Sequence, residues 1–274
     1  MTTILKNTGL LGIVKNNEVW LSDHRFLNDP DEYIYGQNLC LEILKEITDS
    51  ESCLKFKKFL NEVVDKLSKK KCSSIFIASM SLSVDCLDQW RGYGKEPTSV
   101  CIVFNGDYKL WQNENSGLQH IQQQKIIYEE SEQRAVIERF IKIFKDSFYG
   151  KEKIENFTFP FIGKLAYLVE DQFLLFKNKP YKSEKEVRIT IANLRLDLFL
   201  KLIKHRVSNN LIVPYISTKY LTSKDSTPQY KLPIKKIILN PSAHEDQFKS
   251  IENFLSNEGY CDVPVVFSEV KYRG

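Results

Sequence analysis

The chain has 274 residues, of which 42% are hydrophobic and 27% are charged, and its formal net charge is +4. This composition is typical of a globular protein with one large or two small domains. Its longest apolar stretches, such as 211–216, are far shorter than the roughly 20 residues that span a bilayer. The segment Met1–Lys6 lacks the long apolar core of a signal peptide, so we expect no membrane association and a cytoplasmic protein.

The cysteines and histidines show no pattern that holds a metal or a disulfide framework. Six cysteines are scattered without a CxxC pair, and the four histidines have no ligand spacing with them or with each other. We therefore expect free thiols in a reducing cytosol and no metal site.

Alternating apolar segments and turn signals predict a chain in which strands outnumber helices. The expected strands are 19–22, 74–80, 99–104, 125–128, 187–192, 211–216, 234–239 and 263–267, and the expected helices are 30–48, 52–70, 132–148, 163–176 and 244–257. The order is not a regular βα alternation, which favours an α+β fold with mixed or antiparallel sheets and flanking helices. No domain boundary is evident, so a single domain over residues 1–274 is expected.

Two loops carry residues with a structural and a functional interpretation. In the first, Asp29, Pro30 and Glu32 form a capping box for the following helix, although Asn28 and Asp29 are also candidates for binding a ligand. The second, 88–94, is expected to be a glycine-bearing turn with Trp90 and Tyr93. These aromatic residues either anchor the core or stack on a flat ring of a ligand.

The segment Lys182–Ala192 is the most informative part of the sequence. In a strand, side chains at i, i+2 and i+4 point to one face, so Glu184, Glu186 and Arg188 are expected to project together while the other face belongs to the core. Such a row can mount a catalytic carboxylate rigidly beside a cation that binds an anion. The alternative is a solvated edge strand with an ion triplet on one face.

Positive charge is concentrated around this segment. Residues 177–206 contain nine Lys or Arg and three Asp or Glu, an excess of six. This excess favours a phosphate-bearing ligand, either a dinucleotide or a nucleic acid, and an ordinary basic surface is the alternative.

Six motifs in this order resemble a bacterial family, domain of unknown function 2971. They are residues 20–22 with 27–32, 87–94 with 99–104, 182–189, 213–216, 232–241 and 268–273. The resemblance covers essentially the whole chain. Relatives usually begin with an additional strand carrying Tyr or His, whereas this chain proceeds almost at once to Leu10–Ile13.

The layout is also distantly similar to that of DarT-type DNA ADP-ribosyltransferases, and the Glu-x-Glu spacing is similar to that of arginine-modifying ADP-ribosyltransferases. The resemblance implies an ADP-ribosyltransferase-like fold with Glu186 as the catalytic acid and Glu184 as its helper. NAD is then the substrate that donates the ADP-ribosyl group. Its expected contacts are Asn28, Asp29, Trp90, Tyr93 and Arg188.

Three function classes are therefore open. The first is an ADP-ribosyltransferase acting on RNA or DNA as a toxin or antiphage effector, with an antitoxin or another neighbouring-gene product as its partner. The second is a noncatalytic module that binds nucleic acid or nucleotides. The third is a metal-dependent nuclease with Glu184, Glu186 and Asp29 as ligands, although no Asp…Glu-x-Lys pattern surrounds these acids.

Overall fold

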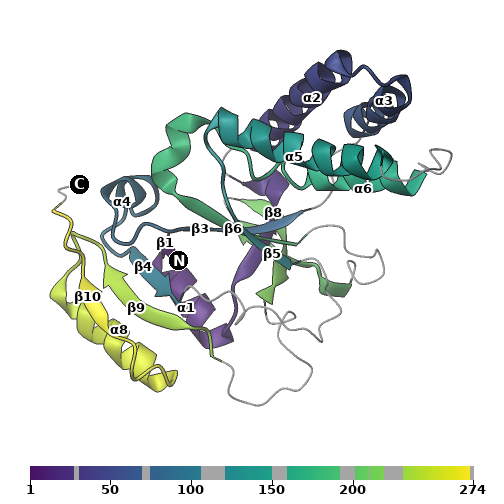
Figure 1. Cartoon of the computed structure of the whole chain (residues 1–274). Coiled ribbons are helices and arrows are strands. Elements are labelled where there is room, and N and C mark those ends of the chain that lie inside the picture. The colour runs from purple at the N-terminus through teal and green to yellow at the C-terminus, as the bar shows by residue number, and fades with distance from the viewer. Residues whose placement is uncertain are drawn as a thin grey trace. The chain divides into compact units, whose positions relative to one another are not determined.

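A computed structural model describes residues 1–27, 31–69, 75–105, 121–149, 159–191, 201–208, 210–218 and 231–271 (Figure 1). Contacts divide the chain into two compact units. Unit 1 comprises Met1–Phe26, Ser74–Gln124 and Ser183–Gly274, and unit 2 comprises Leu27–Ser73 and Lys125–Lys182. The mixed α+β class is confirmed, with a ten-stranded and mostly antiparallel sheet. The single-domain interpretation stays a prediction.

The strands of the sheet are short and come from widely separated parts of the chain. They are β1 (Thr2–Leu5), β2 (Trp20–Asp23), β3 (Phe76–Ser81), β4 (Val100–Phe104), β5 (Ile121–Lys125), β6 (Glu186–Ile191), β7 (Lys204–Ser208), β8 (Leu211–Ser217), β9 (Ile234–Leu239) and β10 (Val265–Phe267). The sequence did not predict β1, which pairs with both β3 and β4. A strand therefore does precede Leu10, but it carries neither Tyr nor His.

The sheet branches at β3. Its main path runs β10-β9-β4-β1-β3-β2-β8-β7, and β6 pairs with β3 and β5 away from that path. All six residues of β3 pair with β6. The opposite edge of β3 is shared, because β2 pairs with Phe76 and Ile77 whereas β1 pairs with Ser81. Among the pairs whose register is described, only β9 and β10 are parallel.

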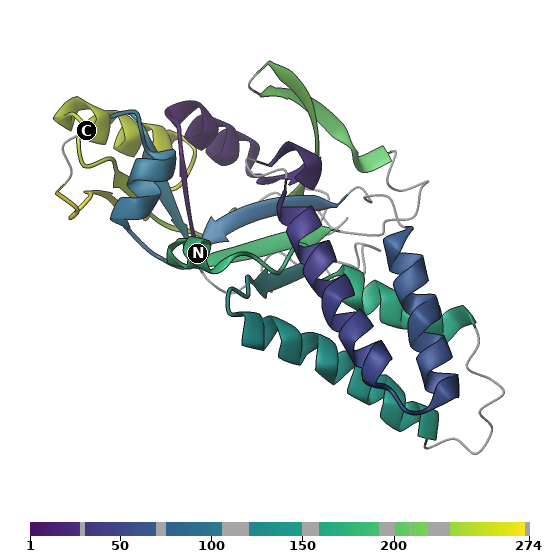
Figure 2. The ribbon, with the colours of Figure 1, turned by 90° about the horizontal axis from the view of Figure 1, so that it is seen from above.

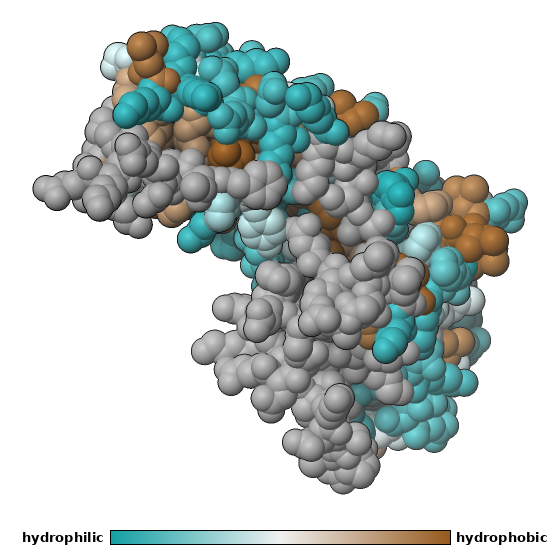
Figure 3. All heavy atoms as spheres, turned by 90° about the vertical axis from the view of Figure 1, so that its right-hand side faces the viewer, coloured by the Kyte–Doolittle hydropathy of each residue, from teal (hydrophilic) through white to brown (hydrophobic). Residues whose placement is uncertain are grey.

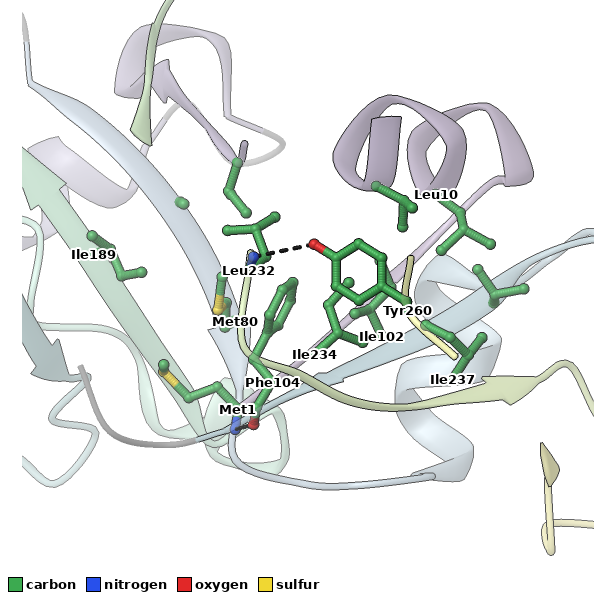
Figure 4. Close-up of a cluster of buried hydrophobic side chains, with 14 of the residues drawn as sticks. Met1, Leu10, Met80, Ile102, Phe104, Ile189, Leu232, Ile234, Ile237 and Tyr260 are labelled. Carbon is green, nitrogen blue, oxygen red and sulfur yellow. Dashed lines mark hydrogen bonds between the residues drawn. The ribbon is translucent and has the colours of Figure 1, made fainter. Parts of the chain in front are cut away.

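One face of this sheet forms the main hydrophobic core of unit 1. Alternate residues of β6, which are Val187, Ile189 and Ile191, point into it together with their partners on β3. Helices α1 (Asn7–Asn16) and α8 (Glu245–Asn257) contribute buried leucine, valine and isoleucine side chains to the same cluster. A hydrogen bond also lies within this core: the Tyr260 hydroxyl accepts from the Leu232 backbone N–H at 3.1 Å (Figure 4).

The opposite face is covered at β4 and β9 by α4 (Leu87–Tyr93). The sequence predicted a turn here, which was wrong. The segment forms two turns of helix because Trp90 packs on Cys101, Val103 and Ile238, a burial that outweighs the low helix propensity of Gly92. The indole N–H of Trp90 donates to Asp85 at 2.8 Å.

Unit 2 is built from four helices that contact one another in a ring (Figure 2). They are α2 (Glu32–Ser50), α3 (Leu54–Ser68), α5 (Glu130–Tyr149) and α6 (Phe159–Glu170). Phenylalanines fill the interface of α3 and α5: Phe56 lies edge-on to Phe148 at 5.3 Å, and Phe59 stacks on Phe144 at 6.2 Å. Each of these pairs adds aromatic contact to the burial of apolar surface.

The start of α2 differs from the predicted capping box. The N-cap is Asp31 rather than Asp29, and its side chain makes no capping hydrogen bond. Glu32 is buried at the first helical position, where its carboxylate pairs with Lys177 at 2.7 Å instead of reaching back to the cap. Residues 28–30 lie outside the described part of the chain.

None of the helices in the described residues is long and apolar enough to cross a membrane. On the face drawn in Figure 3, the described hydrophobic residues form separate small patches among hydrophilic ones. Several of the exposed apolar side chains belong to the β7–β8 hairpin, namely Val207, Leu211 and Ile212.

Candidate functional site

The strand alternation that buries Val187 and Ile189 presents a polar row on the other side of the sheet. We call this side the polar face, defined by Ser22, Ser79, Ser81, Glu186, Arg188 and Thr190. Ser79 lies opposite Arg188 and Ser81 lies opposite Glu186 in the β3–β6 ladder. Ser22 joins the same face because it lies opposite Ile77, the neighbour of Ser79 along the β3 pleat.

Glu186 and Arg188 form a two-pronged ion pair on β6. Arg188 Nε donates to Glu186 Oε1 at 2.6 Å, and Arg188 Nη2 donates to Glu186 Oε2 at 3.0 Å. Both residues are largely buried, with 7% of Glu186 and 2% of Arg188 exposed. The fork of donors matches the carboxylate plane and therefore fixes its orientation. The predicted placement of these two side chains on one face is confirmed by the geometry.

Glu184 does not continue this row. It ends a 3₁₀ helix, η4 (Lys179–Glu184), and β6 begins only at Glu186. Between them Lys185 has a positive φ of 44°, a left-handed conformation that breaks the alternation of a strand. The prediction that Glu184, Glu186 and Arg188 project together from one strand was therefore wrong for Glu184.

Hydrogen bonds from the end of β3 hold the turn that precedes β6. Ser81 Oγ donates to the Glu184 carbonyl at 2.7 Å, and the Leu82 N–H donates to the Lys185 carbonyl at 3.0 Å. On β1, Thr2 Oγ1 donates to the Ser83 carbonyl at 2.8 Å. These contacts hold the turn before Glu186 against the end of β3, so the carboxylate is mounted on a well-supported backbone.

Of the two aromatic candidates, Trp90 is fully buried and Tyr93 is 47% exposed. A ligand ring could stack on Trp90 only if the side chains of Cys101, Val103 and Ile238 moved away. Tyr93 lies on the same helix with an accessible ring. The binding roles of both residues stay predictions.

Asn28 and Asp29, the other expected dinucleotide contacts, lie outside the described residues. In the part of the chain that the structure does describe, no group of three or more His, Cys, Asp or Glu side chains is arranged to hold a metal ion. The nuclease interpretation, which requires Asp29 as a ligand, therefore stays a prediction without structural support.

Part of the positive charge predicted to mark a phosphate site is paired with acids. Lys177 pairs with Glu32, while Lys179 and Lys182 pair with Glu129. These two lysines hold the pKa of Glu129 below its usual range. Together with the Arg188–Glu186 pair, these contacts neutralise four of the nine cations counted in residues 177–206.

Arg206 on β7 is surrounded differently, and the sequence did not single it out. Its guanidinium lies over the Trp20 ring at 5.5 Å from the ring centroid, and its Nη2 donates to Ser22 Oγ at 3.0 Å. Tyr215 packs against the same Trp20 ring at 4.6 Å. We call Trp20, Ser22, Arg206 and Tyr215 the Arg206 cluster. Burial lowers the pKa of Arg206, and Tyr215 acts in the opposite direction.

The cysteines described by the structure are free thiols, which are Cys40, Cys53, Cys86, Cys101 and Cys261. Burial raises the pKa of the Cys101 thiol to about 12 and also raises that of Cys40. Neither thiol is a nucleophile at neutral pH, because the reactive species is the thiolate.

Chemically, the polar face offers an oriented carboxylate at one place and an arginine on an aromatic ring at another. A carboxylate fixed by a bidentate arginine can stabilise a developing positive charge without reorganising. An arginine that contacts only a ring and a hydroxyl can take an anion. The carboxylate on β6 would act on a positively charged group, and the arginine on β7 would bind a negatively charged one. The two side chains lie on different strands.

No curated protein and no solved structure matched the chain. A family model described as a protein of unknown function (DUF2971) matches residues 89–189, a stretch that begins within α4 and includes the Glu186–Arg188 pair. This match supports the resemblance to the DUF2971 family over that part of the chain.

Proposed function

We propose that the protein is an NAD-dependent ADP-ribosyltransferase that modifies nucleic acid in the cytoplasm. In this proposal Glu186 is the catalytic carboxylate and Glu184 assists it. As a toxin or antiphage effector, such an enzyme would be restrained by an antitoxin or another neighbouring-gene protein. The DarT-type likeness belongs to this proposal as well.

The observation that carries the proposal is the bidentate Arg188–Glu186 pair on β6. Transfer of ADP-ribose breaks the bond between the ribose C1 and the nicotinamide nitrogen, and nicotinamide leaves as a neutral molecule. The acceptor nucleophile forms the new bond to C1 and releases its proton to water or to a basic group. The ribose carries positive charge in between, and a carboxylate of fixed orientation stabilises that charge.

The geometry supports a more specific role for Arg188 than direct binding of a phosphate. Both of its prongs are directed at Glu186, so we assign it as a positioning residue. Glu186 is 7% exposed, and the side chains that cover it must therefore move before a ribose reaches its oxygens. Tyr93 is the more exposed of the two aromatic candidates, and in this proposal it contacts a flat base or nicotinamide ring.

A noncatalytic module that binds nucleic acid or nucleotides is the second candidate, and the same ion pair gives it a specific argument. A buried Glu–Arg pair of this geometry also occurs as a purely structural feature of a sheet. In that case the polar face stabilises the fold, and binding takes place elsewhere on unit 1.

Incubation of the pure protein with NAD labelled in the ADP-ribose portion separates these candidates. RNA, DNA and lysate protein are offered in separate tubes, and covalent transfer of label to each is measured. The proposal predicts transfer to RNA or DNA. It also predicts a loss of about two orders of magnitude or more in the Glu186→Gln variant, because the charge facing the ribose is gone.

Glu51→Gln is the matched control. Glu51 is buried and pairs with the partly exposed Lys145 at 2.7 Å, so this variant also removes the charge of a buried, ion-paired carboxylate, but within unit 2. Label transfer should survive in Glu51→Gln. A folded Glu186→Gln protein that transfers label at the wild-type rate would refute the catalytic role, and binding of nucleic acid without any transfer would favour the second candidate.

A further inference from the structure

Within the described part of the chain, no carboxylate pairs with the Arg206 guanidinium. Its hydrogen bond to Ser22 and its contact with Trp20 both involve neutral groups. Its Nε is buried, and within the described residues no acceptor pairs with that atom. Arg206 as a whole is half-buried, and a partly desolvated guanidinium with an unsatisfied donor carries a free-energy cost that an anion can offset.

The carboxylate that contacts Trp20 accepts hydrogen bonds from other groups. Glu18 accepts from the Trp20 indole N–H at 2.7 Å and from the Ser217 hydroxyl. It thereby fixes the orientation of the ring under Arg206 instead of neutralising the guanidinium. Residues 201–218, which include β7 and β8, contain no Asp or Glu.

We propose that the Arg206 cluster is a binding site for the phosphate groups of single-stranded nucleic acid. The guanidinium supplies charge and directed donors for a phosphate oxygen, and Ser22 and Trp20 hold it in place. The lowered pKa of Arg206 agrees with this assignment, because an anion would restore the interaction that burial has removed.

The strand that carries Arg206 favours an extended polyanion over a small anion. Lys204 and Arg206 lie two residues apart and therefore point to the same face of β7. Residues two apart in a strand have Cα atoms separated by about 7 Å, so the two side chains can follow the backbone of one extended strand. β7 is also a terminal strand of the sheet path, so a long ligand can pass along it. Lys201 and His205 add exposed basic groups nearby.

This inference deepens the proposed function, since it places contacts to the acceptor at Arg206 and separates them from the catalytic Glu186. The two ideas can fail independently. A variant that binds nucleic acid but no longer transfers ADP-ribose would report on the role of Glu186. A variant that no longer binds nucleic acid would report on the role of Arg206.

The test is a fluorescence anisotropy titration of a labelled single-stranded oligonucleotide at several salt concentrations. We expect Arg206→Gln to weaken binding about tenfold or more, as removal of a charge-assisted phosphate contact does. The slope of log K against log salt should fall in magnitude by about 0.7, the value for one phosphate contact on a single strand. Glu186→Gln should bind like the wild type.

Arg139→Gln is the matched control, because Arg139 is exposed on α5 and this variant changes the net charge by the same amount. Equal losses in Arg139→Gln and Arg206→Gln would show that only overall charge matters and would overturn the site. So would a wild-type protein that does not bind the oligonucleotide. Two other results would overturn the nucleic-acid assignment. They are binding of inorganic phosphate without binding of the oligonucleotide, and retention on anionic vesicles without binding of the oligonucleotide.

Discussion

Two arginines on the same face of one sheet have opposite surroundings. Arg188 on β6 meets a carboxylate with two of its nitrogen atoms, and almost none of its surface is exposed. Arg206 on β7 meets a ring and a hydroxyl, and its Nε has no partner within the described residues. A charge that the fold has already neutralised stabilises the protein, whereas a charge left without a counter-ion is available to a ligand. On this basis we propose that Arg188 positions Glu186 and that Arg206 binds the ligand.

The largest expected effect is on the free energy of unfolding of Arg188→Met. This variant leaves Glu186 as a buried charge without its bidentate partner, and breaking a buried pair in this way costs about 3–5 kcal/mol. Urea unfolding measures it. The double variant Glu186→Gln/Arg188→Met should recover part of the loss, because no buried charge is then left alone. Additive losses in the double variant would argue that the pair is not coupled.

A smaller loss of stability is expected for Glu18→Gln. Glu18 affects Arg206 indirectly, because it holds the Trp20 ring that lies under the guanidinium. The Glu18 carboxylate accepts from Trp20 and Ser217 while buried, and hydrogen bonds to a charged acceptor contribute about 1.5–3 kcal/mol. The urea midpoint should fall accordingly. Oligonucleotide affinity should fall as well, since Trp20 is less firmly held under Arg206. An unchanged affinity would show that the orientation of Trp20 does not matter to the site.

The smallest expected change in stability belongs to Arg206→Met. Removing an arginine that lacks a counter-ion relieves an unfavourable burial, so the free energy of unfolding should change by less than about 0.5 kcal/mol or even rise. The same urea titration that reports Arg188→Met measures this difference. A loss as large as that of Arg188→Met would mean that Arg206 is structural, and the comparison between the two arginines would fail.

The sequence predicted elements well where the pattern was long and local. The predicted strand 234–239 coincides with β9, and the predicted helix 244–257 coincides with α8. Both segments have a regular spacing of apolar residues and a well-marked first residue. The strand β1 was missed since four residues carry little periodicity. The helix α4 was assigned as a turn because Gly92 and Gly94 are turn signals, and only tertiary burial of Trp90 overrides them.

The candidate site was predicted only in part, and for similar reasons. Placement of Glu186 and Arg188 on one face needs only the two-residue period of a strand. The position of Glu184 depends on the positive φ of Lys185, which a lysine rarely adopts and which no local pattern announces. The Arg206 cluster joins β2 to β7 and β8 across more than 180 residues of sequence, and a single sequence contains no signal for such a contact.

Thermal unfolding with and without a single-stranded oligonucleotide tests the division between the two arginines most directly, using the wild type, Arg188→Met and Arg206→Met. The account predicts that the oligonucleotide raises the melting temperature of the wild type, as any ligand selective for the folded state does. Arg188→Met should melt at a lower temperature but keep that rise, whereas Arg206→Met should melt near the wild type and lose it. A ligand-induced rise that persists in Arg206→Met, together with a melting temperature as low as that of Arg188→Met, would contradict the account.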